Sequence, residues 1–120
     1  MENSLKSWKS IDKQAEFQKE SEKLTALFAN ADENQKKLAA GLIEDAAYLY
    51  AENKVLREML SESGMVRINP ANPAQQRPIE AAKQYRANVD TYSSVMGRLY
   101  RILDSQERDE EDDMSDYEKD

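Results

Sequence analysis

The stretch Gly64-Met65-Val66-Arg67-Ile68-Asn69-Pro70-Ala71-Asn72-Pro73-Ala74-Gln75-Gln76-Arg77-Pro78 decides how this chain folds. It holds all three prolines of the 120 residues and separates two long segments with helical periodicity. Gly64 supplies the positive φ that commonly closes a helix. Pro78 fits the first turn of the next helix, where its missing N–H costs nothing. The sequence therefore predicts two long helices folded back on each other through a connector at 64–77.

The segment before the connector predicts a helix over 33–63. Asp32 is a good N-cap, and Gln35 three residues later can complete a capping box. Apolar residues then follow a 4-3-4-3-4 spacing that contains one polar residue, Asn53, which either fixes register and oligomeric state or faces outward. Further apolar residues widen this surface beyond what one partner helix covers, which favours self-association. The seam of this helix comprises Leu42, Ala46, Leu49, Asn53, Leu56 and Leu60.

The segment after the connector predicts a helix over 78–103, with the most regular 3-4 spacing in the chain. Its tyrosines either pack in a core or interface with their hydroxyls at a wet edge, or stack on nucleic-acid bases. Together with the first seam, these positions form the predicted hairpin or oligomer seam. They are Ala82, Tyr85, Val89, Tyr92, Met96, Leu99 and Leu103.

Local signals at the N-terminus and in the connector are weaker. Residues 1–31 predict a frayed arm over 1–9, followed by an amphipathic helix from about Ser10 to Asn30. In the connector, residues 65–68 predict a short strand or an extended run. Asn69 and Asn72 each precede a proline, which disfavours helix at both positions.

The net charge of −7 is unevenly distributed along the chain. Residues 104–120 contain ten acidic and two basic side chains, and we expect this acidic tail to be disordered because it cannot bury enough apolar area. The rest of the chain is nearly neutral, with a basic second half. Met114 and Tyr117 make the tail either a solubilising segment, a docking peptide for a basic partner, or an internal competitor for a DNA surface. The predicted fold is thus all-α: a helical hairpin over 32–103, an N-terminal helix and a tail.

Several classes of function are disfavoured by composition. The sequence has no cysteine and no histidine, which removes zinc sites, thiol nucleophiles and the commonest general base. No phosphate-binding loop or nucleophile elbow is present. We therefore expect no enzyme activity, no cofactor and no small-molecule substrate. No apolar run is long enough to span a bilayer and no signal peptide is evident, so we expect no membrane partner and a cytoplasmic location.

Basic side chains form three loose groups that are candidates for DNA phosphate contact. Lysines on helical surfaces usually serve only solvation, and phosphate binding needs several such groups presented together. An oligomer would multiply them around an axis. The candidate DNA-binding residues are Lys9 and Lys13 on the N-terminal arm, Lys36 and Lys37 at the start of the 33–63 helix, and Arg67 and Arg77 in the connector.

The order of these segments resembles the small-subunit family of tailed-phage terminases, in the branch that pairs two long helices. The resembling part runs from about residue 38 to residue 103. It includes Leu56-Arg57-Glu58-Met59-Leu60 leading to Ser63-Gly64, then Asn72-Pro73-Ala74, and then the tyrosine-bearing helix from Tyr85 to Leu103.

The resemblance implies a non-catalytic protein that recognises double-stranded viral DNA for packaging in the host bacterial cytoplasm. It also implies a homo-oligomeric ring that recruits the large ATPase–nuclease subunit. Many members carry an N-terminal helix-turn-helix, for which only residues 11–37 are available here. The alternative from another class is a helical adaptor or scaffold that acts only through protein–protein contacts.

Overall fold

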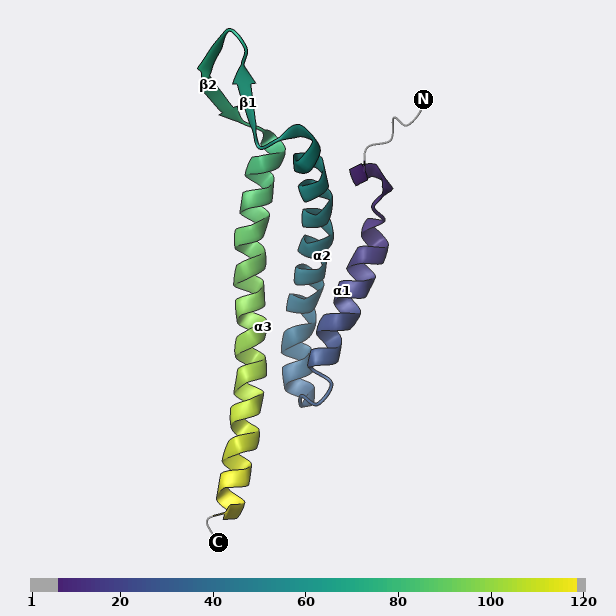
Figure 1. Cartoon of the computed structure of the whole chain (residues 1–120). Coiled ribbons are helices and arrows are strands. Elements are labelled where there is room, and N and C mark those ends of the chain that lie inside the picture. The colour runs from purple at the N-terminus through teal and green to yellow at the C-terminus, as the bar shows by residue number, and fades with distance from the viewer. Residues whose placement is uncertain (1–6, 119–120) are drawn as a thin grey trace.

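The computed structural model describes residues 7–118, with side chains for residues 8–77 and 79–105. It is an elongated helical molecule, 78 × 35 × 20 Å in extent, in which α2 lies between α1 and α3 (Figure 1). The elements in order are a 3₁₀ helix η1 (Ser7–Ser10), α1 (Lys13–Leu27), α2 (Glu33–Ser63), β1 (Val66–Asn69), β2 (Asn72–Pro78) and α3 (Glu80–Glu118). The predicted helical hairpin with an additional N-terminal helix is confirmed.

The start of α2 follows the predicted local chemistry. Asp32 accepts a hydrogen bond from the backbone N–H of Gln35 at 2.8 Å, and the Gln35 side chain accepts one from the N–H of Asp32 at 3.3 Å. This reciprocal pair satisfies two N–H groups that a helix start otherwise leaves without partners. At the other end, Gly64 has φ +79° and its N–H bonds to the carbonyl of Leu60. The predicted bounds of 33–63 are confirmed.

The hairpin seam is buried or half-buried along its whole length, and α2 and α3 pack closely because small residues lie where they meet. Ala39, Ala46 and Ala82 have no exposed surface. A cluster of buried residues joins all three helices at the end of the molecule near the α1–α2 turn. It comprises Leu24, Phe28, Ala31, Ala39, Ile43, Ala46, Val95 and Leu99.

The second apolar side of α2 is covered within the chain, which corrects one sequence-based expectation. Two ion pairs join α1 to α2: the Lys13 ammonium lies 3.0 Å from the Glu52 carboxylate, and Lys54 lies 3.1 Å from Glu16. Trp8 of η1, in the segment predicted to fray, is half-buried beside Val55 and Met59 of α2. This side of α2 therefore packs on η1 and α1 of the same chain.

The segment considered for a helix-turn-helix folds differently. α1 and α2 run side by side in opposite directions and are joined by a turn over residues 28–32 (Figure 1). A helix-turn-helix instead crosses its two helices at roughly 90–120° so that the second can enter a groove. Residues 11–37 therefore form part of an antiparallel helix pair.

The expectation of a short strand or extended run over 65–68 is confirmed by β1, which pairs with β2 in a two-stranded antiparallel hairpin, so the fold is not purely α-helical. The end of the last helix differs from the expectation. α3 does not end near Leu103 but continues as helix to Glu118, over residues predicted to form a disordered tail. The physical reason is that no glycine or proline follows Gly97 to end the helix. The side chains of Met114 and Tyr117 lie outside the described residues.

In the part of the chain that the structure describes, no helix combines the length and the apolar character that a membrane span requires.

Candidate nucleic-acid interface

The β1–β2 hairpin, called the ribbon below, projects from the end of the helical body (Figure 1). Every residue from 61 to 77 is exposed, so neither face of the ribbon packs on the body. A two-stranded hairpin without such packing is marginally stable in water. The ribbon therefore depends on its own tip for order, or on a binding partner.

The tip is built by a tandem Asn-Pro-Ala repeat at residues 69–74. In each copy the asparagine side chain accepts a hydrogen bond from the alanine N–H two residues on: Ala71 to Asn69 at 2.9 Å and Ala74 to Asn72 at 3.3 Å. Such side-chain turns mimic a backbone turn and fix the chain reversal. The Asn69 side-chain Nδ2 also donates to the side-chain Oε1 of Gln75 at 2.7 Å, which joins the two strands.

The strand register places the two predicted connector arginines directly opposite each other. Arg67 pairs with Arg77, while Val66 pairs with Pro78 and Ile68 with Gln76. Because side chains alternate between the faces of a strand, Arg67 and Arg77 share one face, and Val66 and Ile68 share the other. The ribbon thus has a basic face and an aliphatic face.

The arginine pair has no counter-charge among the residues whose side chains are described. Neither guanidinium forms an ion pair with a carboxylate of these residues. Like charges directly opposite each other destabilise an antiparallel pair. A bound anion removes that repulsion, and paired guanidinium groups suit phosphate oxygens because each can donate two parallel hydrogen bonds.

The other predicted DNA-binding lysines are not brought to this site. Lys13 pairs with Glu52, and the Lys36 ammonium lies 3.9 Å from Glu33. Lys36 and its exposed neighbour Lys37 lie on the first turns of α2, at the opposite end of that helix from the ribbon (Figure 1). Lys9 lies in η1, with its ammonium 5.4 Å from the centre of the Trp8 ring. Lys9 and Lys13 line one hollow beside α2, whereas Arg67 and Arg77 are placed directly opposite each other on the ribbon.

The acidic segment lies far from the ribbon within one chain. α3 starts beside the ribbon and carries residues 104–118 away from it by at least about 36 Å at 1.5 Å per residue. The backbone of α3 therefore leads this segment away from the ribbon of its own chain. Competition of the acidic segment for a DNA surface stays a prediction, because its side chains beyond residue 105 lie outside the described residues.

Comparison with protein-family models, with curated proteins and with solved structures finds no match to this chain.

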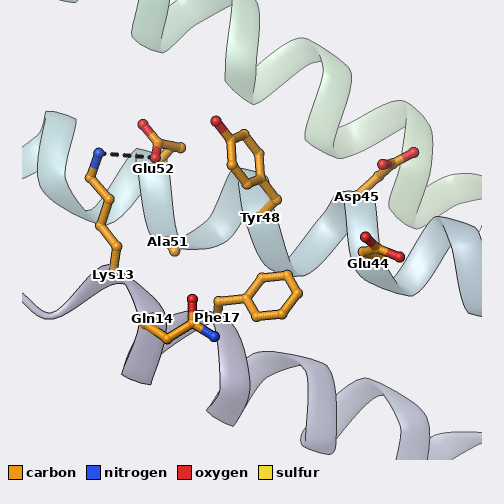
Figure 2. A pocket seen from close by; sticks show the side chains of 8 residues that line it. All are labelled: Lys13, Gln14, Phe17, Glu44, Asp45, Tyr48, Ala51 and Glu52. Carbon is orange, nitrogen blue, oxygen red and sulfur yellow. Dashed lines mark ion pairs between the residues drawn. The ribbon is translucent and has the colours of Figure 1, made fainter.

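A second concave region lies between α1 and α2 and encloses about 600 Å³ (Figure 2). Phe17 of α1 and Tyr48 and Ala51 of α2 give it an apolar lining. The Lys13–Glu52 ion pair lies at one end, and Glu44 and Asp45 lie at the other (Figure 2). We call this region the α1–α2 groove; it was not predicted, because its two walls are distant in sequence.

The interior holds a polar cluster at the level of the middle of α2. Glu20 of α1 is 5% exposed, and Asn53 of α2 is 8% exposed with an Oδ1 that has no hydrogen-bond partner among the described residues. The Tyr92 hydroxyl lies near Glu20, and burial followed by the Glu20 charge raises the Tyr92 pKa above 10.0. We assign these buried polar groups a structural role.

No metal site is evident in the described part of the chain, where no three carboxylates are grouped closely enough to hold an ion.

Proposed function

We propose that this chain is the small subunit of a phage terminase, a non-catalytic protein that binds double-stranded viral DNA and starts genome packaging. In this proposal it assembles as a ring and recruits the large ATPase–nuclease subunit. The order of sequence motifs supports the family assignment. The helical hairpin and the ribbon between its helices are compatible with that assignment.

The observation that carries the DNA-binding part is the opposition of Arg67 and Arg77 on the exposed ribbon. A two-stranded ribbon fits the major groove of B-DNA, which is about 12 Å wide. Its arginines would then contact phosphates, which position a protein on DNA without reading its sequence. In a ring, each subunit would contribute one such pair, so that contacts too weak to act alone would add together.

DNA binding is tested by fluorescence anisotropy with a labelled duplex over a range of salt concentrations. The slope of log affinity against log salt has a magnitude of roughly 0.9 for each phosphate that the protein neutralises. We expect Arg67→Ala with Arg77→Ala to flatten the slope by about 2 per engaged subunit. The matched control is Lys36→Ala with Lys37→Ala, which removes the same charge from the other end of α2 and should leave the slope nearly unchanged.

Native mass spectrometry tests the assembly part of the proposal. A closed ring of many subunits supports the packaging role, and a stable monomer that does not bind DNA contradicts it. Co-purification with the large subunit then tests recruitment. Deleting residues 104–120 in that assay determines whether the acidic segment is the recruiting element.

The α1–α2 groove favours a second candidate, a helical adaptor that acts only on proteins. Its aromatic lining and its exposed carboxylates at Glu44 and Asp45 suit a cationic, partly apolar protein segment. An adaptor requires no salt-dependent DNA binding. The substitutions of Arg67 and Arg77 described above therefore separate the two candidates, because in an adaptor there would be no DNA affinity for them to reduce.

A further inference from the structure

The α1–α2 groove carries negative charge that forms no ion pair with the described side chains of its own chain. Lys13 compensates Glu52, at an Nζ–carboxylate distance of 3.0 Å. Glu44 and Asp45 are both exposed and form no ion pair within the residues whose side chains are described. Beside them lie the half-buried Phe17 and the 59% exposed ring of Tyr48 (Figure 2). This end of the groove therefore suits an aromatic side chain flanked by cations.

The part of α3 that lies beside the end of α1 presents that combination, where Tyr100 lines a hollow with Leu24 and Leu27 of α1. Tyr100 is 68% exposed, the most exposed large hydrophobic residue in the described part of the chain. Arg98 and Arg101 are on the same stretch of helix, one turn apart, and both are exposed. An exposed aromatic ring with adjacent cations is typical of an interface anchor, since Tyr and Arg are both enriched at such positions. We call residues 98–101 the α3 ridge.

The groove and the ridge lie at the same height along the molecule. Ile43 and Ala46 of α2 belong to the same buried cluster as Val95 and Leu99 of α3, so the two helices meet there. Glu44, Asp45 and Tyr48 are therefore level with the ridge. A neighbour placed beside the molecule, without a shift along its long axis, would bring its ridge to the groove.

We infer that the α1–α2 groove binds the α3 ridge of a second copy of this chain. Tyr100 of one copy packs against Phe17 and Tyr48 of the next, and Arg98 and Arg101 neutralise Glu44 and Asp45. The contact joins two different surfaces, and such contacts form a ring if the rotation closes and a filament if it does not. Equal height of the two surfaces favours a rotation without a rise, and therefore a ring. The inference rests on the self-association in the proposed function and names the interface that produces it.

Charge exchange across the interface tests this inference by native mass spectrometry and light scattering. Glu44→Arg with Asp45→Arg should convert the assembly into monomers, and so should Arg98→Glu with Arg101→Glu. When all four substitutions are combined in one chain, each interface regains opposite charges and the assembly should return. None of the four side chains is buried, so circular dichroism should show unchanged helix content.

The matched control for the groove variant is Glu22→Arg with Glu33→Arg, which makes the same change in charge at exposed positions outside the groove. It should leave the subunit count unchanged. An assembly that withstands both reversals, or a combined variant that stays monomeric, overturns the inference. The inference is also overturned if the groove variant keeps its subunit count but no longer binds a cationic partner other than this chain.

Failure of this inference is distinguishable from failure of the proposed function. If the ring persists in both charge-reversed variants and its DNA binding depends on Arg67 and Arg77, the interface is wrong and the function stands. If the unaltered protein is a monomer without affinity for DNA, the proposed function itself fails.

Discussion

Glu20 of α1 and Tyr92 of α3 lie close together, inside a molecule in which most contacts between helices involve α2, and the Glu20 charge helps to raise the Tyr92 pKa. Glu20 is 5% exposed, and the Lys23 ammonium lies 3.9 Å from its carboxylate. The hydroxyl therefore compensates a buried carboxylate that would otherwise have lost much of its hydration. This contact fixes α1 against the hairpin.

We expect Tyr92→Phe to lower the free energy of unfolding by about 1–3 kcal/mol, because the substitution leaves Glu20 without this polar neighbour. Urea unfolding followed by circular dichroism measures the change. Tyr85→Phe is the matched control, since Tyr85 is a half-buried tyrosine of the same seam, and it should cost much less. Equal losses of unfolding free energy in the two variants would show that the Tyr92 hydroxyl does not stabilise the buried Glu20 carboxylate.

The same contact makes stability depend on pH at the alkaline end. The Tyr92 pKa lies above its ordinary value of 10.0, because burial and the Glu20 charge both favour the neutral phenol. A raised pKa in the folded state means that the contribution is complete below about pH 10 and is lost as pH rises through 10 towards the folded pKa. We expect the unfolding free energy to fall more between about pH 9 and pH 11 in the unaltered protein than in Tyr92→Phe. Parallel curves for the two proteins would contradict the assignment.

Replacing Asn53 with leucine is predicted to raise the free energy of unfolding, whereas replacing Tyr92 is predicted to lower it. Its side chain is buried and its Oδ1 has no partner among the described residues, so an apolar group of similar volume removes a desolvation penalty. We expect Asn53→Leu to raise the unfolding free energy by about 1 kcal/mol, and Asn53→Asp to lower it. Native mass spectrometry of Asn53→Leu then tests whether the asparagine specifies the oligomeric state. A mixture of subunit counts would indicate that it does.

Two glycines in different conformations form a matched pair. Gly64 has φ +79°, which L-residues with a side chain rarely adopt, although nothing lies within 4 Å of an added Cβ. Gly41 is inside α2, also with open space around an added Cβ. We expect Gly64→Ala to destabilise by about 1 kcal/mol or more through backbone strain, and Gly41→Ala to stabilise by roughly 0.5–1 kcal/mol through helix propensity. Thermal unfolding that changed in the same direction for both would be inconsistent with this difference.

The parts of the fold that the sequence predicted well depend on local chemistry. The bounds of α2 were predictable from residues at each end. Asp32 and Gln35 cap the first backbone N–H groups, and Gly64 adopts the positive φ that ends the helix. The seam was predictable because its spacing reports one helix face directly. The end of α3 was not predictable, because a high density of charge does not by itself stop a helix that no glycine or proline interrupts.

The ribbon shows why the candidate site was only partly predictable. Arg67 and Arg77 were candidates from charge alone, but their opposition depends on the register, which the Asn69 and Asn72 turns help to fix. The repeated Asn-Pro-Ala triplet is the sequence signal that could have predicted this tip. The α1–α2 groove had no comparable signal, because Phe17 and Tyr48 meet only when the helices pack.

The arginine pair implies that affinity for an anion and stability of the ribbon oppose each other. Arg77→Thr removes one of two like charges and adds a β-branched residue. Gln76→Thr also adds a β-branched residue, on the other face of the same strand, but removes no charge. Hydrogen exchange should show greater protection of ribbon amides in Arg77→Thr than in Gln76→Thr, while only Arg77→Thr weakens duplex binding. In the unaltered protein, added duplex should raise ribbon protection towards the Arg77→Thr level. If the two threonine variants protect the ribbon equally and the duplex has no effect, the two guanidinium groups do not repel each other significantly and the case for an anion between them fails.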